Sequence, residues 1–333
     1  MTPDLVLIWA ALIAFAVFVY VMLDGFDLGI GILFPLIGDA RQRDTAINTV
    51  APIWDGNETW LILGGGGLFA VFPLAYSVLL TAFYAPLIAM LLALVFRGVA
   101  FEFRFRSRAH RGLWDVAFAA GSCLATFCQG LILGGIIQGV TIDGRGYAGG
   151  WFDWLSPFSL FTAVALCAGY ATLGAGWLVI KVEGELQCLA FRCMRRTAFA
   201  LMISIAMVSL WTPWMHPGIA ARWFSWPNLA WLCPVPLLVA ATGICLHRAI
   251  AMRREVTPFL LTLVLFLLAY VGLLVSLYPN IIPPDVTLWQ AAAPDATLGF
   301  LLIGTALLLP LVIGYTAYAY WTFRGKVHAE SYH

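Results

Sequence analysis

The sequence predicts an all-α, polytopic transmembrane helical protein, and two observations support this fold class. Hydrophobic residues make up 62% of the 333 residues and charged residues only 11%, whereas soluble domains are about 45–50% apolar and about 25% charged. The apolar residues also fall into runs of roughly 20 residues, the length that a helix needs to cross the hydrocarbon core. A net charge of +1 gives no basic surface of the kind that binds nucleic acid.

The apolar runs predict about nine membrane crossings. The first run follows an N-terminus without a basic residue or a small-residue cleavage motif, so we expect a retained helix and not a signal peptide. From helix number, we predict one integral membrane domain, 1–333, with a four-helix bundle in 1–140, a second in 158–278 and a peripheral helix at 298–322. The runs cover residues 5–36, 53–73, 77–98, 113–140, 158–180, 198–215, 229–247, 259–278 and 298–322.

Basic residues collect in every second loop of this arrangement. Arg41 and Arg43 follow the first run, and further Arg and Lys residues follow the third, fifth, seventh and ninth. The loops on the other side hold only Arg145 and Arg222 and are rich in Trp. Because basic residues near helix ends stay in the cytoplasm and Trp gathers at membrane interfaces, we expect the N-terminus outside and the C-terminus in the cytoplasm.

Ionisable residues beside the apolar runs are concentrated in the first third of the chain, on the predicted cytoplasmic side. Each is costly in a membrane unless it has a partner or a water-filled cavity. One interpretation is a carboxylate relay for protons, and the other is helix capping together with an ion pair that fixes packing. Spacing alone slightly favours the second interpretation. The residues are Asp24 and Asp27 in the motif at 24–29, Asp55 and Glu58 in the motif at 54–60, and Arg97 and Glu102.

Four motifs resemble subunit II of the cytochrome bd-type quinol oxidases. The similarity extends along essentially the whole chain, and the short length and compact outer loops are closer to the cyanide-insensitive branch. The motifs are Asp-Gly-Phe-Asp-Leu-Gly at 24–29, Trp-Asp-Gly-Asn-Glu-Thr-Trp at 54–60, Gly-Gly-Leu-Phe-Ala-Val-Phe-Pro at 66–73 and Phe-Arg-Gly-Val-Ala-Phe-Glu-Phe-Arg at 96–104.

The resemblance implies a heterodimer in the cytoplasmic (inner) membrane of a bacterium. Its subunit I carries two b-type haems, one d-type haem and the quinol site, while subunit II has no complete active site. Such a complex oxidises quinol and reduces dioxygen to water with cytoplasmic protons, generating a membrane potential without pumping. The resemblance also allows a structural quinone and one or more small single-helix subunits. None of the five histidines lies well inside a predicted helix, which agrees with a haem-free chain that also binds no metal.

By matching motif, the resemblance suggests that Asp55 passes protons toward the partner, with Asp24 and Glu102 as helpers. Glu58 stands where the family often has Gln, so it either strengthens the relay or caps the helix. Asp27 and Arg97 are expected to be structural charge partners. Trp60 matches a position on an apolar route for dioxygen. Two alternatives remain open, a proton-coupled secondary transporter and a scaffold for a haem-bearing partner.

Overall fold

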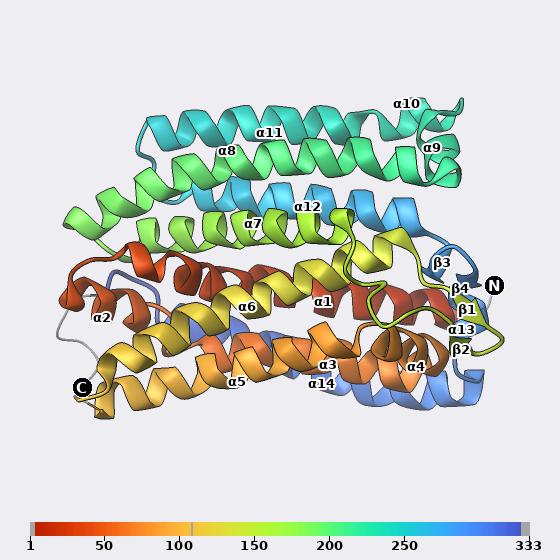
Figure 1. The fold of residues 1–333 in the computed structure, drawn as a ribbon, viewed down its shortest axis with the longest axis horizontal. Helices are drawn as coiled ribbons and strands as arrows, with labels where there is room; N and C mark the ends of the chain where they lie inside the picture. The colour runs from red at the N-terminus through yellow and green to blue at the C-terminus, as the bar shows by residue number, and fades with distance from the viewer. Residues whose placement is uncertain (1–3, 108, 328–333) are drawn as a thin grey trace.

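A computed structural model describes residues 4–107 and 109–327 as a bundle of long helices that run side by side (Figure 1). Within this part of the chain, 8 helices are long and apolar enough to cross a membrane, or up to 9 if a pair of helices that meet at 120° forms one further span. The all-α transmembrane class is therefore confirmed. The 8 helices are α1 (Leu5–Leu33), α5 (Tyr84–Arg106), α6 (Arg111–Gln138), α7 (Pro157–Lys181), α8 (Gly184–Met215), α11 (Pro234–Ala251), α12 (Thr257–Leu277) and α14 (Asp295–Thr322), and the bent pair is α3 (Trp54–Val71) and α4 (Pro73–Ala82).

Short elements close the two ends of the bundle (Figure 1). One end carries the 3-10 turn η1 (Phe34–Leu36) and α2 (Ala40–Asn48). The other end carries two antiparallel hairpins, one pairing β1 with β2 and one pairing β3 with β4. α1 begins at this second end, and α14 ends at the first. The elements of the second end are β1 (Ile142–Asp143), β2 (Gly146–Tyr147), α9 (Pro217–Phe224), α10 (Asn228–Leu232), β3 (Asn280–Ile282), β4 (Val286–Thr287) and α13 (Leu288–Ala291).

The predicted boundaries of two runs were wrong. The run at 77–98 is not one helix, because the chain breaks after Val71 and Pro73 restarts it as α4, before α5 begins at Tyr84. Proline favours a helix start, since it lacks the N–H that an interior position would need. In contrast, α10 and α11 follow each other across Cys233 and together form one candidate span, Asn228–Ala251, as predicted for the run at 229–247. Finally, α8 already begins at Gly184, so the arginines between 192 and 196 lie on a helix and not in a loop.

Two glycines bring the backbones of α1 and α7 into contact. A Cβ on Gly29 would lie 1.8 Å from the backbone oxygen of Tyr170, and a Cβ on Gly174 would lie 2.4 Å from the carbonyl carbon of Gly29. Small residues allow such an approach between membrane helices. Since Gly29 ends the motif at 24–29, the same contact fixes the position of the two aspartates in that motif.

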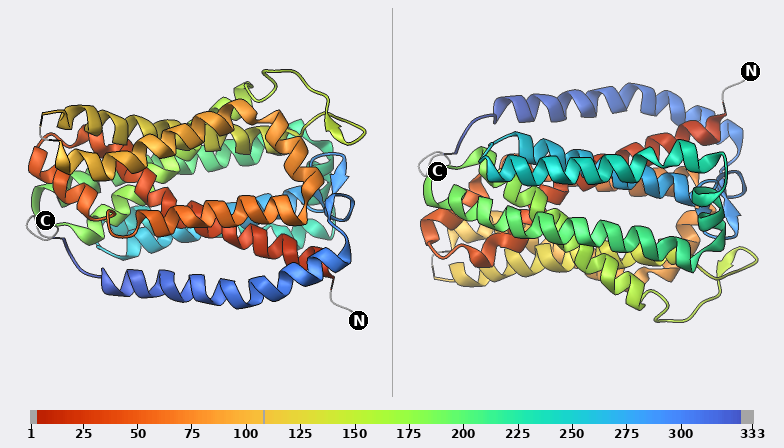
Figure 2. Two further views of the ribbon diagram at one scale, coloured as in Figure 1. Left: turned by 90° about the horizontal axis from the view of Figure 1, so that it is seen from below. Right: turned by 90° about the horizontal axis from the view of Figure 1, so that it is seen from above.

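The helices α1, α3, α5 and α6 lie together on one side of the bundle, and α7, α8, α11 and α12 lie on the other (Figure 1). α7 packs against α1 and α6 as well as α8, so the two sets share a continuous interface and their division into separate bundles stays a prediction. α14 runs along one edge, beside α1 and α3 (Figure 2). Among its described residues, only Leu298 is buried.

Candidate functional site

A buried ion pair joins α1 to α5. Arg97 Nη2 donates to Asp24 Oδ1, and both side chains are 0% exposed. The Arg97 guanidinium also lies 5.6 Å from the ring centre of Trp54 and 5.9 Å from that of Phe101. Glu58 on α3 approaches from a more open side, with its Oε2 3.8 Å from Arg97 Nη1 and its side chain 24% exposed. One guanidinium therefore serves carboxyl groups from two other helices.

A third carboxyl, Asp27, lies one turn further along α1 and is 1% exposed. Its Oδ2 accepts a hydrogen bond of 2.8 Å from Asn57 Nδ2. Asn57 Oδ1 in turn accepts a hydrogen bond of 2.9 Å from the Tyr320 hydroxyl of α14. We refer to Asp24, Asp27, Glu58 and Arg97 as the acidic cluster.

The acidic cluster has more carboxyl groups than cations. With three carboxylates and one guanidinium, its charge would be −2 if every group were ionised. An uncompensated charge inside a membrane protein is unfavourable by several kcal/mol, about 3–5 kcal/mol where a buried pair is broken. The cluster is thus more stable when it holds protons than when it is fully ionised, which makes proton uptake and release the chemistry available to it.

Two of the six predicted charged residues lie outside the acidic cluster. Asp55 is exposed in the first turn of α3, and the N-cap position is Ile53, which makes no side-chain cap. The interpretation of Asp55 as an N-cap residue was therefore wrong. Glu102 is also exposed and pairs with Arg106 at 3.5 Å. It follows Arg97 by five residues, which places it roughly 140° around α5. The expected convergence of six charged groups is reduced to four.

A second buried polar chain begins one turn before Asp24. The Tyr170 hydroxyl of α7 donates to Gln129 Oε1 on α6 at 2.9 Å, and Gln129 Nε2 donates to the Tyr20 hydroxyl on α1 at 2.7 Å. Neither these residues nor Asn57 and Tyr320 were predicted from the sequence. Gln129 could have been found, because a lone polar residue in an apolar run is costly and indicates a partner or a functional site. The tyrosines at 20, 170 and 320 cannot be distinguished from packing residues by spacing.

Trp60 lies inside the protein, two turns along α3 from the exposed start of that helix. It is 2% exposed, packs edge-on against Phe15 with ring centres 5.9 Å apart, and belongs to an apolar cluster with Ala16 and Tyr20. These surroundings are apolar, as a route for dioxygen needs to be. The role of Trp60 in dioxygen access stays a prediction.

The described histidines do not fit the axial positions of a haem. His110 precedes α6 and His216 follows α8, at opposite ends of the bundle. His247 lies within α11, with its Nδ1 2.9 Å from the Gly243 backbone oxygen. Haem in a helix bundle takes ligands such as His or Met that face it from the helices. Among the described residues there is also no group of three or more His, Cys, Asp or Glu side chains that could hold a metal ion.

A second set of charges closes the end of the bundle that carries α2. Arg104, whose side chain is 0% exposed, donates to Asp115 at 2.5 Å and to Asp44 at 2.6 Å. Arg111 also donates to Asp44, and Arg43 pairs with Asp115 at 3.0 Å. We refer to these three arginines and two aspartates as the basic network. It joins α2, α5 and α6.

Comparison with known proteins gives one consistent result. The family model described as "Cytochrome bd terminal oxidase subunit II" matches residues 5–323. The chain is 26% identical over 360 residues to "Cytochrome bd-I ubiquinol oxidase subunit 2" of Escherichia coli (strain K12), covering 97% of this chain and 95% of the relative. It is 27% identical over 334 residues to "Cytochrome bd ubiquinol oxidase subunit 2" of Bacillus subtilis (strain 168), covering 97% of each. A chain of the bd oxidase from Geobacillus thermodenitrificans has the same fold, with a TM-score of 0.78, 18% identity and coverage of 97% of this chain and 99% of that one.

Proposed function

This chain belongs to the cytochrome bd terminal oxidase subunit II family, and we propose that within the oxidase it takes up protons from the cytoplasm for the haem-bearing partner. Membership confirms the resemblance noted in the sequence. The chain is thus a subunit of an oxidoreductase of the respiratory chain, it spans the inner membrane several times, and its family implies a partner subunit I and haem cofactors in the complex. This favours the oxidase over the secondary transporter.

The orientation that we propose places the end with α2 in the cytoplasm. This end holds the basic network, whereas the opposite end holds Arg145 and Arg222 and many exposed tryptophans. Lys and Arg near helix ends are retained on the cytoplasmic side, and Trp prefers the interface. The N-terminus then lies in the periplasm and the C-terminus in the cytoplasm.

The observation that carries the proposal is the graded burial of carboxyl groups from the surface to the interior. Asp55 is exposed, Glu58 is 24% exposed, and Asp24 is 0% exposed. Asp55 and Glu58 share the first turns of α3, and Glu58 and Asp24 share Arg97. A proton that enters on a carboxylate oxygen at the surface can be exchanged inward through groups of the same chemistry, while Arg97 limits the cost of each ionised state.

The first experiment substitutes the outermost carboxyl, Asp55→Asn, in the complete oxidase. Because the amide cannot carry the proton, we expect oxygen consumption with quinol to fall by about tenfold or more, with the reduced-minus-oxidised haem spectrum unchanged. Asp285→Asn is the matched control, since Asp285 is an exposed aspartate at the opposite end of the bundle. Wild-type turnover of Asp55→Asn would leave only the scaffold role.

The wider composition of the complex follows from the resemblance. We propose two b-type haems and one d-type haem on the partner, quinol and dioxygen as substrates, and a membrane potential generated without pumping. A structural quinone and small single-helix subunits are part of the same proposal. Purification through a tag on this chain tests it, by the haem bands, bound quinone and protein bands of the complex. Oxygen affinity of a Trp60→Phe variant tests the dioxygen route.

A further inference from the structure

The proposed proton path over Asp55, Glu58 and Asp24 gives no role to Asp27, the remaining carboxyl of the acidic cluster. Its Oδ2 is held by Asn57 Nδ2 at 2.8 Å, while its Oδ1 is buried and has no hydrogen-bond partner among the described residues. A carboxylate with one oxygen held and the other open can accept a proton without first breaking a hydrogen bond. Asp24 Oδ2 likewise has no partner among the described residues, but Asp24 Oδ1 is bound by the cationic Arg97 guanidinium, whereas Asp27 Oδ2 is held by a neutral amide.

The amide of Asn57 is fixed in one orientation by two different partners. An amide offers a carbonyl oxygen that only accepts and an NH2 group that only donates. Here the oxygen accepts from the Tyr320 hydroxyl at 2.9 Å, and the nitrogen donates to Asp27. The Tyr320 ring itself packs edge-on against Phe26 and Trp177, with ring centres 6.4 Å and 5.9 Å away. The orientation of Asn57 is therefore set from α1, by Asp27 and by the Leu23 backbone oxygen 3.5 Å from Asn57 Nδ2, together with Tyr320 of α14.

A purely structural role, the attachment of α14 to the bundle, explains these contacts less well. The segment that follows α14 is already attached, because Lys181 Nζ donates to the backbone oxygens of Phe323 at 2.5 Å and Gly325 at 3.1 Å. Attachment through Tyr320 would also need only the hydrogen bond to Asn57. Instead, the hydrogen bonds continue from Asn57 to Asp27, an ionisable carboxyl with a free oxygen.

We propose that Asn57 and Tyr320 are positioning residues that hold Asp27 with its Oδ1 free to accept and release a proton, so that proton exchange at this carboxyl depends on the position of α14. In the step itself an O–H bond forms at Asp27 Oδ1 and the carboxylate becomes a neutral acid. Release breaks that bond and restores the carboxylate, and no electron is transferred. The proposal rests on the proposed function of proton uptake.

The charge at Asp27 depends on groups from every helix around it. Arg97 and the Asn57 N–H stabilise a negative charge on Asp27, whereas burial and the carboxyl groups of Asp24 and Glu58 oppose it. A change at Asn57 therefore removes one of the two groups that stabilise the carboxylate. The titratable and charged groups that face Asp27, or face Asp24 beside it, are Tyr20 and Asp24 on α1, Glu58 on α3, Arg97 on α5, Tyr170 on α7 and Tyr320 on α14.

The test uses the purified oxidase with four variants of this chain and two measurements. The variants are Asn57→Leu, Tyr320→Phe, Asp27→Asn, which assigns the infrared band, and the control Tyr318→Phe, which changes an exposed tyrosine of the same helix. The measurements are the pH profile of turnover and the infrared band of a protonated carboxyl, assigned to Asp27 by its loss in Asp27→Asn. Asn57→Leu removes a hydrogen bond to a carboxylate, so we expect the profile to move to higher pH by about one unit. Tyr320→Phe should move the pH profile less and should shift the infrared band of Asp27. Tyr318→Phe should change neither the pH profile nor the band.

The outcomes separate this inference from the proposed function. An unchanged profile and band in both Asn57→Leu and Tyr320→Phe, or no band lost in Asp27→Asn, would overturn it even if Asp55→Asn is slow. A shifted band in Tyr320→Phe together with a wild-type rate of Asp55→Asn would support Asp27 and remove Asp55 from the path. If Asn57→Leu does not assemble, Tyr320→Phe decides alone, because phenylalanine keeps the ring packing on Phe26 and Trp177.

Discussion

The acidic cluster and the basic network both surround an arginine whose side chain is 0% exposed, Arg97 in one and Arg104 in the other. They differ in their balance of charge. The acidic cluster sets three carboxyl groups around one guanidinium, whereas the basic network sets three guanidinium groups around two carboxylates. In the basic network each carboxylate is bound by two arginines, which joins three helices firmly.

This difference in charge balance separates charges suited to stability from charges suited to proton exchange. A carboxylate held by two guanidinium groups gains little by taking a proton, so the basic network is suited to fix the end of the bundle. A carboxyl in excess over the available cations gains by taking a proton, so the acidic cluster is suited to proton exchange. Substitutions in the basic network should therefore affect stability more than turnover, and substitutions of carboxyl groups in the acidic cluster should affect turnover more than stability.

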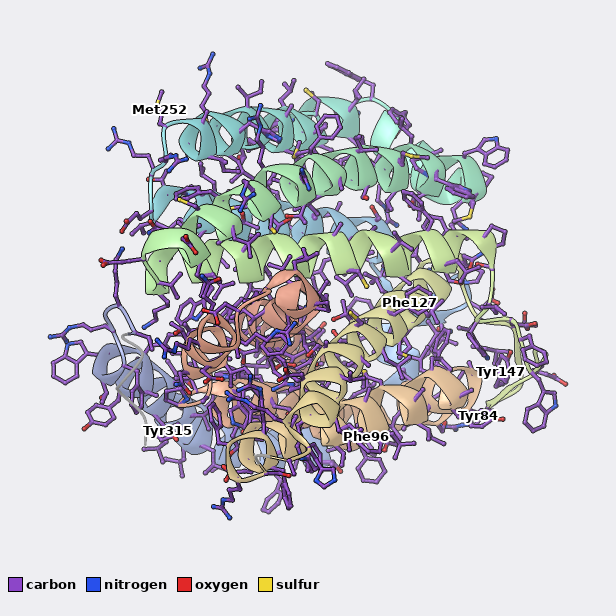
Figure 3. All side chains as sticks on the ribbon, turned by 60° about the vertical axis from the view of Figure 1, so that its left-hand side comes forward. Tyr84, Phe96, Phe127, Tyr147, Met252 and Tyr315 are labelled. Atoms are coloured by element: carbon purple, nitrogen blue, oxygen red, sulfur yellow. The ribbon has the colours of Figure 1, made fainter. Side chains whose placement is uncertain are left out.

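The largest effect is expected from Arg97→Leu. This change leaves the buried carboxyl groups without their cation, which should cost about 3–5 kcal/mol of folding free energy and reduce the amount of assembled oxidase. Thermal unfolding and the haem content of membranes measure it. The control is Phe96→Leu, since Phe96 lies on the outer surface of α5 (Figure 3). An Arg97→Leu oxidase as stable as this control would contradict a dependence of the acidic cluster on its single cation.

The next largest effect is expected from Asp115→Asn, which should lower stability and leave turnover unchanged. Arg104 Nε and Arg43 Nη1 each lose a charged acceptor, which we expect to cost about 1–3 kcal/mol. Turnover per haem and its pH profile should stay at wild-type values. Asp143→Asn, at the exposed hairpin of the opposite end, is the control for thermal unfolding. A changed pH profile in Asp115→Asn would mean that the two charge regions are coupled.

Glu58→Gln should have the opposite effect to Asp115→Asn and lower turnover without lowering stability. Removal of one carboxyl from a region with an excess of carboxyl groups relieves repulsion, so the free energy of unfolding should stay the same or rise, in contrast to Asp115→Asn. Turnover should fall, because the group between the exposed and buried carboxyls can no longer carry a proton. Oxygen consumption per haem and thermal unfolding on one preparation check both parts. Loss of stability without loss of turnover would assign Glu58 a packing role.

The smallest effect is expected where the chain after α14 meets the bundle. Hydrogen bonds from Gln187 and Lys326 lower the pKa of Glu255, whose side chain is 46% exposed. A lowered pKa gives stability that is present above the ordinary pKa of a glutamate and lost as the pH falls through the lowered value. Lys326→Ala should therefore lower the melting temperature slightly at neutral pH, and the difference should vanish in acid. A difference that persists in acid would show that Lys326 acts without Glu255.

Much of the fold could be predicted from composition and spacing. Long apolar runs predicted the transmembrane helices, because hydrocarbon leaves few alternatives for a spanning backbone. The errors occurred where proline or helix-forming polar residues set the boundaries, as at Pro73 and at the start of α8. Hydropathy alone does not report such boundaries.

The candidate site was predicted in part. The motifs at 24–29 and 54–60 drew attention to Asp24, Asp27 and Glu58, since charges beside apolar runs are rare, and the structure brings these three together, while their role in proton transfer stays a prediction. Glu102 and Asp55 looked equivalent in sequence but are exposed in the structure. Which side of a helix faces the interior depends on its neighbours, and nearly uniform apolar sequence around these residues carries little information about that side.

Hydrophobic length and family motifs are local features, so they are enough to identify this chain as a multi-pass membrane protein of the bd oxidase subunit II family. The gathering of three carboxyl groups around Arg97, and the hydrogen bonds that link Tyr320 through Asn57 to Asp27, are visible only in the folded protein. Asp27 and Tyr320 are far apart in the chain, and their connection depends on the close contacts of α1, α3 and α14. Such contacts arise from packing, which no local pattern encodes.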